Sequence, residues 1–166
     1  MEPFRGIHQM IGPWPLRELV DPVEVVEAAE DVATWGFPRA IEADEVVYGS
    51  WFRMGRGVIF WFEAPHPQAP DAALLHLAVA PRYRSRWPVK RWAVAVEIVA
   101  ELMGASRLLA AFPEDCPQRD YAIRLGWQKS DGPRLVRWLG GAHGREERRA
   151  LEHRSDLQEV FVEGRE

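Results

Sequence analysis

The sequence predicts a single α/β domain with a mixed, mostly antiparallel central sheet and flanking helices. Two runs rich in β-branched and aromatic residues, at 46–53 and 58–63, are separated by the glycine-containing segment 54–57, which is typical of a β-hairpin. A short apolar strand, a long apolar helix and another short strand then follow, at 74–80, 88–103 and 107–112. Such a strand–helix–strand unit requires a right-handed crossover, so we expect its two strands to be parallel.

Before the hairpin, the sequence predicts an edge strand and a helix. The segment from Phe4 to Ile11 mixes apolar and polar residues and is closed by Gly12-Pro13-Trp14-Pro15, which indicates a short strand followed by a turn. Asp21-Pro22-Val23-Glu24 combines an N-cap aspartate, a proline at the first helical position and a glutamate in the first turn. We therefore expect a helix from Pro22 to about Trp35.

The later elements differ in how deeply they are expected to lie. The strand at 58–63 is apolar on both faces, which predicts a central position in the sheet. The helix at 88–103 is apolar on nearly every face, so it should be deeply buried. A second capping pattern at Asp115-Cys116-Pro117-Gln118 opens a short helix that ends at Leu125-Gly126-Trp127, and 134–139 is a last strand.

Composition limits the classes of partner and the cell compartment. The chain of 166 residues has 21 Lys and Arg against 25 Asp and Glu, and this net charge of -4 disfavours general binding to nucleic acid or an anionic membrane. Cys116 is the only cysteine, so no intrachain disulfide and no cysteine-rich metal site can form. The first residues lack a signal-peptide pattern, and no apolar run reaches about 20 residues. We expect a cytoplasmic protein without a metal.

The last part of the chain differs in composition from the rest. Residues 143–166 are rich in Arg and Glu, with Leu151, Leu157, Val160 and Phe161 among them. This pattern predicts a solvated helix and a tail that lies on this chain or another. We therefore divide the chain into a folded domain at 1–142 and a charged C-terminal helix or tail at 143–166. The tail and the tryptophan-rich surface are candidates for self-association or for binding a protein partner.

A basic turn joins the strand at 74–80 to the long helix. Its sequence is Pro81-Arg82-Tyr83-Arg84-Ser85-Arg86-Trp87-Pro88. A turn of this kind directs the first helical N–H groups and arginines to one point, where an anion can bind. A docking patch for an acidic partner or for nucleic acid, and an ordinary solvated turn, are the alternatives. Tyr83 and Trp87 could stack on an adenine or anchor an interface.

The order of elements, together with 79–87 and Ala122-Ile123-Arg124-Leu125-Gly126-Trp127, resembles the GNAT family of acetyl-CoA-dependent N-acyltransferases over roughly 46–139. In that family a turn of the form Arg/Gln-x-x-Gly-x-Gly/Ala binds the coenzyme A pyrophosphate. The resemblance implies a GNAT-like domain that transfers an acetyl group to an amine. The residues that it implies for binding acetyl-CoA are Val79, Arg82, Arg84, Arg86 and Lys90.

The turn departs from the family pattern at the glycine positions. Arg84 lies at the first Arg/Gln position, but Trp87 and Val89 lie where the family has small residues, with Pro88 between them. Side chains at these positions crowd the phosphate, and proline has no N–H to donate. Loss of one charge-assisted contact costs about 1.5–3 kcal/mol. We therefore expect a degenerate pyrophosphate loop with weakened coenzyme binding, partly offset by the neighbouring basic side chains.

The sequence offers candidate residues for proton transfer, with Tyr121 as the candidate acid for the coenzyme thiolate. Five residues before Trp127 the family usually has a tyrosine that returns a proton to the coenzyme thiolate, but this chain has Ala122, and Tyr121 lies about 100° away around the helix. The candidate bases for the attacking amine are His76, Glu63 and His66. The structural alternatives are a hydrogen-bonded strand residue for His76 and a solvated carboxylate for Glu63.

Two functions follow from these patterns. The first is an acyl-CoA-dependent N-acyltransferase with impaired coenzyme binding and reduced activity. The alternative is a non-catalytic protein that uses the GNAT fold as a scaffold. The Arg-x-Arg-Trp turn is similar to that of GNAT-like proteins encoded by tailed phages, which implies a virion or assembly component and a place in the virion rather than the cytoplasm. A third reading, a small nucleic-acid-binding module, conflicts with the net negative charge.

Overall fold

The computed structural model describes residues 8–11, 14–86, 89–112 and 117–139. These residues form two compact units. Of the described residues, the first unit contains those up to Ala64 and 76–86, and the second contains Pro65–Leu75, 89–112 and 117–139. Strand β5 (Ala72–Val79) begins in the second unit and ends in the first. The strands follow one another in the order β1-β2-β3-β4-β5-β6-β8-β7.

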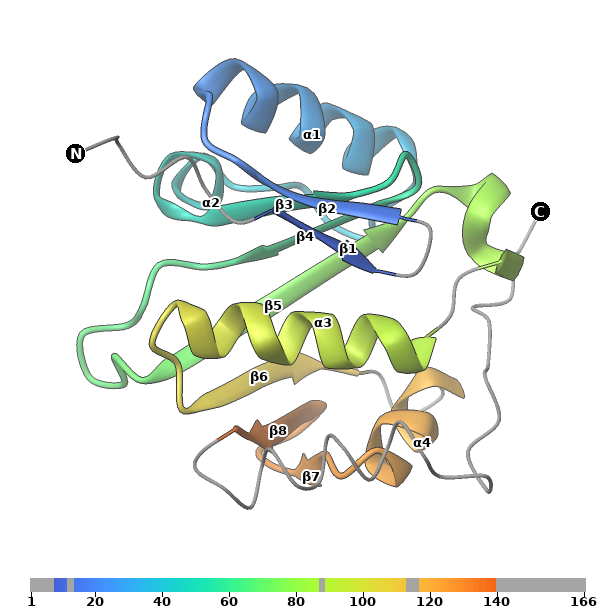
Figure 1. The fold of residues 1–166 in the computed structure, drawn as a ribbon. Coiled ribbons are helices and arrows are strands. Elements are labelled where there is room, and N and C mark those ends of the chain that lie inside the picture. Colours follow the sequence, from blue (N-terminus) through green and yellow to red (C-terminus); the bar gives the residue numbers. More distant parts are fainter. Residues whose placement is uncertain (1–7, 12–13, 87–88, 113–116, 140–166) are drawn as a thin grey trace. The chain divides into compact units, whose positions relative to one another are not determined.

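The first unit is built on antiparallel strands (Figure 1). They are β1 (His8–Ile11), β2 (Trp14–Leu19), β3 (Ser50–Met54) and β4 (Val58–Phe62), each antiparallel to the next. The predicted hairpin is confirmed as β3 and β4, and Gly55 in its turn has a φ of 59°, which favours glycine. Every residue of β4 is buried, as its apolar pattern predicts.

Helix α1 (Pro22–Thr34) covers one face of these strands. The predicted helix start is confirmed, because the Asp21 carboxylate accepts a hydrogen bond of 2.9 Å from the Val23 N–H. Small and branched residues at helical spacing face the sheet and are buried. The core that they form with the strands contains Leu19, Val25, Ala28, Val32, Trp51, Ile59, Trp61 and Ala78.

Two predictions for the first unit are wrong. Residues 46–48 were expected in a strand but end a short helix, α2 (Ala43–Tyr48). Glu42 and Glu45 form a reciprocal capping box, and this local polar pattern outweighs the strand preference of Val46, Val47 and Tyr48. Trp14 and Pro15 were expected in a turn but begin β2, where the Pro15 carbonyl accepts a hydrogen bond from the Gly55 N–H.

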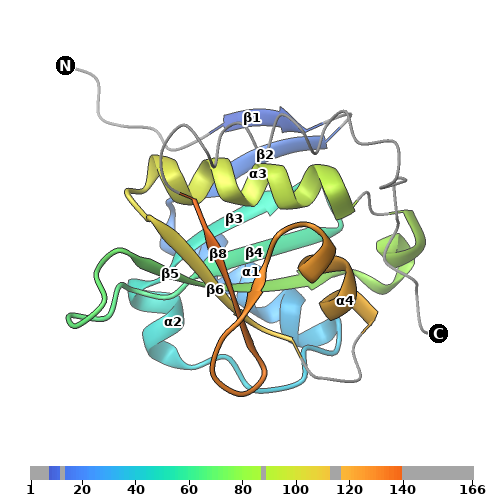
Figure 2. The ribbon, with the colours of Figure 1, turned by 90° about the horizontal axis from the view of Figure 1, so that it is seen from below.

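The second unit contains the predicted strand–helix–strand arrangement (Figure 2). The first residues of β5 pair in parallel with β6 (Arg107–Ala111), and α3 (Val89–Leu102) lies along β6. Strand β8 (Arg134–Trp138) pairs antiparallel with β6 and with β7 (Gln128–Lys129), whose two residues are too short to give a sequence signal. The α/β class and the parallel unit are confirmed. None of the helices in the described ranges is long and apolar enough to cross a membrane.

Helix α4 (Pro117–Arg124) matches the predicted short helix. Its predicted capping residues Asp115 and Cys116 lie outside the described residues, as does the tail at 143–166. The division between 1–142 and 143–166 therefore stays a prediction.

A buried ion pair lies in the second unit. One of its members belongs to helix α3, which the sequence predicts to be apolar on nearly every face. Glu97 of α3 and Arg137 of β8 are 3% and 4% exposed, and the Arg137 Nε donates to the Glu97 carboxylate. Arg137 Nη1 lies 3.5 Å from the carbonyl oxygen of Gly126, at the end of α4. The pair therefore links three elements through charge-assisted contacts, which apolar periodicity could not predict.

Candidate functional site

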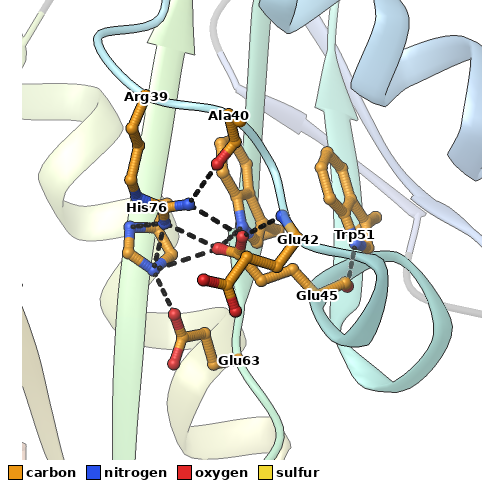
Figure 3. A network of polar contacts seen from close by, with 8 residues as sticks. Arg39, Ala40, Glu42, Glu45, Trp51, Glu63 and His76 are labelled. Carbon is orange, nitrogen blue, oxygen red and sulfur yellow. Dashed lines mark hydrogen bonds and ion pairs between the residues drawn. The ribbon is translucent and has the colours of Figure 1, made fainter.

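Two of the predicted bases meet in the first unit. His76 lies on β5, and Glu63 directly follows β4. The His76 Nε2 and the Glu63 Oε1 are 2.9 Å apart (Figure 3). The His76 side chain is 18% exposed and that of Glu63 is 36% exposed. The structure thus brings together an imidazole and a carboxylate that keep access to solvent.

Glu45, which sequence reasoning missed, is the buried member of the same cluster. Its carboxylate accepts hydrogen bonds from Arg39 Nη1 at 2.8 Å and Nη2 at 2.7 Å, from the Glu42 N–H at 2.8 Å and from Trp61 Nε1 at 3.2 Å. The side chain is only 6% exposed. The Glu42-x-x-Glu45 spacing could have revealed the helix start, but nothing in it indicates contact with His76.

The electrostatics of Glu45 follow from these donors. The hydrogen bond from Arg39 lowers the pKa of the Glu45 carboxyl to about 2, against the opposing effect of burial. The same bond raises the pKa of the Arg39 guanidinium. Both groups are therefore charged at neutral pH. We call Arg39, Glu45, Glu63 and His76 the polar cluster; with a neutral imidazole its net charge is -1.

Arg39 and aromatic rings hold the imidazole of His76. Arg39 Nη2 lies 3.5 Å from His76 Nδ1 and 3.4 Å from Nε2. The Trp61 ring centroid is 5.2 Å from the imidazole, and Phe37 approaches it edge-on at 6.5 Å. Trp61 is in turn stacked on Trp51 at 4.5 Å, and the Trp51 Nε1 donates to the Glu45 carbonyl oxygen at 2.8 Å. The imidazole therefore packs on buried, hydrogen-bonded aromatic side chains.

The polar cluster also contains three groups with metal-ligating chemistry. Ligand atoms of Glu45, Glu63 and His76 lie within 4.8 Å of one another. The Arg39 guanidinium, however, lies 2.7 Å from the Glu45 Oε1 and 3.4 Å from the His76 Nε2. A metal ion bound to these atoms would meet this positive charge at close range. The chemistry of the cluster therefore does not favour a metal.

The basic turn adopts a 3-10 helix, η1 (Pro81–Arg86), in the first unit. The Ala80 N–H donates to the Gly57 carbonyl oxygen at 2.7 Å, and the Tyr83 N–H donates to the Ala80 carbonyl oxygen at 2.9 Å. The Tyr83 ring packs so closely on Gly57 that a side chain there would overlap it, and the Arg82 guanidinium lies 4.8 Å from the ring centroid. Tyr83 and two backbone donors are therefore engaged within the chain.

The structure describes only some of the other side chains that the sequence predicts at the site. Val79 is buried at the end of β5. The side chains of Arg84, Arg86, Lys90 and Tyr121 lie outside the described part of the structure, so their roles stay predictions. Ala122, at the position where the resemblance implies a tyrosine, is buried.

His66, the third candidate base, is exposed in the second unit. Its Nδ1 accepts a hydrogen bond of 3.1 Å from the Gln68 N–H. This is a local contact within a loop, and none of the groups of the polar cluster takes part in it.

Comparison with known proteins identifies the fold. No family model and no curated protein matches the sequence. Among solved structures, the GNAT domain of S. lividans PAT is 16% identical, with a TM-score of 0.55 over 76% of this chain and 90% of its own.

Two further solved structures agree with this match. A protein described as a GNAT-family acetyltransferase from Desulfovibrio desulfuricans is 16% identical, with a TM-score of 0.61 over 77% of this chain and all of its own. The ribosomal-protein-S5-alanine acetyltransferase of Vibrio fischeri is 9% identical, with a TM-score of 0.58 over 80% of this chain and 96% of its own. Identities this low establish the fold alone. The chain therefore has the fold of the GNAT acetyltransferases.

Proposed function

We propose that this protein is an acetyl-CoA-dependent N-acyltransferase that transfers an acetyl group to an amine. The observation that supports this function best is the hydrogen-bonded pair of His76 and Glu63. His76 lies on β5, three residues before Val79, and the basic turn directly follows that strand. A proton-accepting pair and a turn rich in cations thus lie on consecutive segments of one chain, which suits an amine acceptor and a phosphorylated acyl donor.

The reaction needs a proton acceptor because an alkylamine is protonated at neutral pH. The His76–Glu63 pair takes the ammonium proton, and the freed nitrogen lone pair attacks the thioester carbonyl carbon. The carbon–sulfur bond then breaks, and the thiolate of coenzyme A takes the proton that the new amide nitrogen gives up. The buried Ala122 offers no hydroxyl for that last transfer, so water carries the proton.

In this proposal the coenzyme is bound by Val79, Arg82, Arg84, Arg86 and Lys90. The arginines supply most of the attraction for the pyrophosphate, since Trp87, Pro88 and Val89 replace the usual small residues. The affinity should accordingly be lower than an intact glycine turn provides. Lower affinity is compatible with turnover when the coenzyme is abundant.

Isothermal titration with acetyl-CoA tests the proposal directly. We expect binding that weakens at least tenfold in the Arg84→Ala variant. Arg134→Ala is the matched control, because it removes an exposed arginine of β8 and should leave binding unchanged. Absence of binding at millimolar acetyl-CoA, or equal losses in both variants, would contradict the acyltransferase proposal.

A non-catalytic scaffold is the second candidate, and two observations favour it. The Tyr83 ring is packed on Gly57, and alanine lies at the tyrosine position of α4. A GNAT-fold protein that had lost coenzyme chemistry could use the exposed Trp138 and the tail at 143–166 to bind a protein partner, for example in a phage virion. This candidate predicts that removing residues 143–166 changes the number of subunits per particle, as measured by light scattering. An unchanged oligomeric state would count against it.

A further inference from the structure

We propose that the solvent-facing side of α1 and α2 is a docking surface for a basic, amphipathic polypeptide segment. Apolar side chains are exposed on these two helices, and carboxylates without a cationic partner surround them. Docking at this surface would be independent of the acyltransferase function, because the side chains concerned lie outside the polar cluster.

Large apolar side chains are exposed mainly in one part of the first unit. Eight such side chains are exposed among the described residues, and five of them lie between positions 20 and 48. Apolar side chains scattered singly on a surface are ordinary, whereas a group of them marks an interaction site. We call these five the apolar face, and they are between 46% and 68% exposed: Val20, Val23, Val26, Val47 and Tyr48.

The residues of the apolar face come from neighbouring elements. Val23 and Val26 are three residues apart on α1, so they lie on adjacent turns. Helices α1 and α2 contact each other, and Figure 1 shows α2 beside the end of α1 where that helix begins. Strands β2 and β3 are paired as far as Leu19 and Trp51, which brings Val20 close to the end of α2. The fold therefore gathers the apolar face in one region of the first unit.

The exposed valines of α1 do not belong to its buried side. Val25, Ala28 and Val32 recur at helical spacing and pack against the strands. Val23 is two residues before Val25, which places it about 160° around the helix from that buried position. Val23 therefore faces solvent rather than the core of the first unit.

The charge around the apolar face indicates the kind of partner. Residues 18–52 contain nine Asp and Glu but only one Lys or Arg, Arg39. Three of these acidic side chains form ion pairs, with Arg17, Arg39 and Arg53. Five further carboxylates form no ion pair with any described residue, and they leave the region negatively charged. These five are Asp21, Glu27, Glu30, Glu42 and Asp44.

Other occupants conflict with this charge. Nucleic acid and an anionic membrane would be repelled. A second copy docked through the same face about a two-fold axis would bring the same carboxylates together. The tail at 143–166 has seven Asp and Glu against five Arg, so its net charge is also negative.

A segment with Lys or Arg beside apolar side chains complements both properties of the surface. Its cations would face the unpaired carboxylates, and its apolar side chains would cover the valines. The exposed ring of Tyr48 supplies an anchor of the type that dominates many protein interfaces. The surface therefore fits a basic, amphipathic segment better than the other occupants.

Titration of the full-length protein with a labelled synthetic peptide, in the absence of acetyl-CoA, tests this docking. The peptide contains only leucine and lysine, spaced so that a helix carries leucine on one side and lysine on the other. Fluorescence anisotropy should show saturable binding that weakens as salt is added. A peptide with glutamate in place of lysine should not bind, and one with serine in place of leucine should bind at least about tenfold more weakly.

Substitutions on the apolar face locate the binding surface. Val23→Ser and Tyr48→Ser should each weaken binding of the leucine–lysine peptide, and together they should weaken it by about tenfold or more. Leu102→Ser is the matched control, because Leu102 is 66% exposed but lies on α3 in the second unit. This control should bind the peptide like the wild type. Because all three side chains are exposed, thermal unfolding should show that the variants remain folded.

A second pair of variants tests the role of charge. Asp44→Asn removes one of the unpaired carboxylates and should weaken binding at low salt, with a smaller effect at high salt. Asp120→Asn removes an exposed carboxylate of α4 in the second unit and should have less effect.

Several results would overturn the assignment of this surface. They are absence of binding, equal binding of the leucine–lysine and serine–lysine peptides, and equal losses in the variants of the apolar face and in Leu102→Ser. None of these measurements involves acetyl transfer. A failed titration would leave the acyltransferase proposal standing, and a protein without transferase activity would leave the docking surface standing.

Discussion

Replacement of Glu45 by Gln removes the buried charge of the polar cluster while keeping the shape of the side chain. In the wild-type protein this carboxylate binds Arg39 through two hydrogen bonds of 2.7 and 2.8 Å and accepts further bonds from Glu42 and Trp61. In Glu45→Gln the amide keeps one oxygen acceptor, but its NH2 group faces donors. The variant therefore loses charge-assisted bonds and leaves the arginine without its counter-ion.

The cost can be estimated from the pKa of the carboxyl group. Lowering that pKa from 4.5 to about 2 corresponds to ~3 kcal/mol of stability at neutral pH. The Arg39 side chain is 41% exposed, so solvent screens part of the interaction. We expect Glu45→Gln to lower the free energy of unfolding by ~2–3 kcal/mol at neutral pH.

The pH dependence gives the sharper test. The folded protein binds this proton more weakly than the unfolded chain, so the stabilisation is complete above about pH 5 and is lost as the pH falls toward 2. The difference between wild type and Glu45→Gln in urea unfolding should therefore shrink over that range. Glu30→Gln makes the same chemical change at an exposed site on α1 and serves as the control. A stability difference that does not vary with pH would refute the electrostatic explanation.

Three further predictions concern the stability of the fold. Gly57→Ala should destabilise the protein by about 1–3 kcal/mol in thermal unfolding, because the new methyl group overlaps the Tyr83 ring, and Tyr83→Ala in the same chain should relieve part of this loss. Arg137→Met should cost about 3–5 kcal/mol in chemical denaturation by removing the guanidinium that donates to the buried Glu97 carboxylate, and a loss below 1 kcal/mol would contradict this. Asp21→Ala should cost about 1 kcal/mol and Asp21→Ser much less, as measured by urea unfolding, if the N-cap bond matters.

The errors at the sequence level have a common physical origin. Val46, Val47 and Tyr48 favour strand locally, yet they belong to α2 because the capping box at Glu42 and Glu45 satisfies the first N–H groups of a helix. Proline at position 15 predicts a turn, yet Pro15 belongs to β2, where it lies opposite Met10 of β1. At α2 the local strand preference was outweighed by the side-chain bonds of the capping box, which the Glu42-x-x-Glu45 spacing could have indicated. At β2 the local turn preference was outweighed by backbone pairing with β1 and β3, which short-range preference does not indicate.

By itself the sequence determined the α/β class, helix α1 with its aspartate cap, the β3–β4 hairpin and the parallel unit of β5 and β6, because these depend on periodicity and turn chemistry within short segments. It also singled out His76 and Glu63 as separate candidates. Only the tertiary structure joined them to each other and to Arg39 and Glu45, since side chains from two loop positions, a short helix and a strand meet through folding and leave no spacing to recognise. The proton-accepting role proposed for the His76–Glu63 pair depends on those contacts.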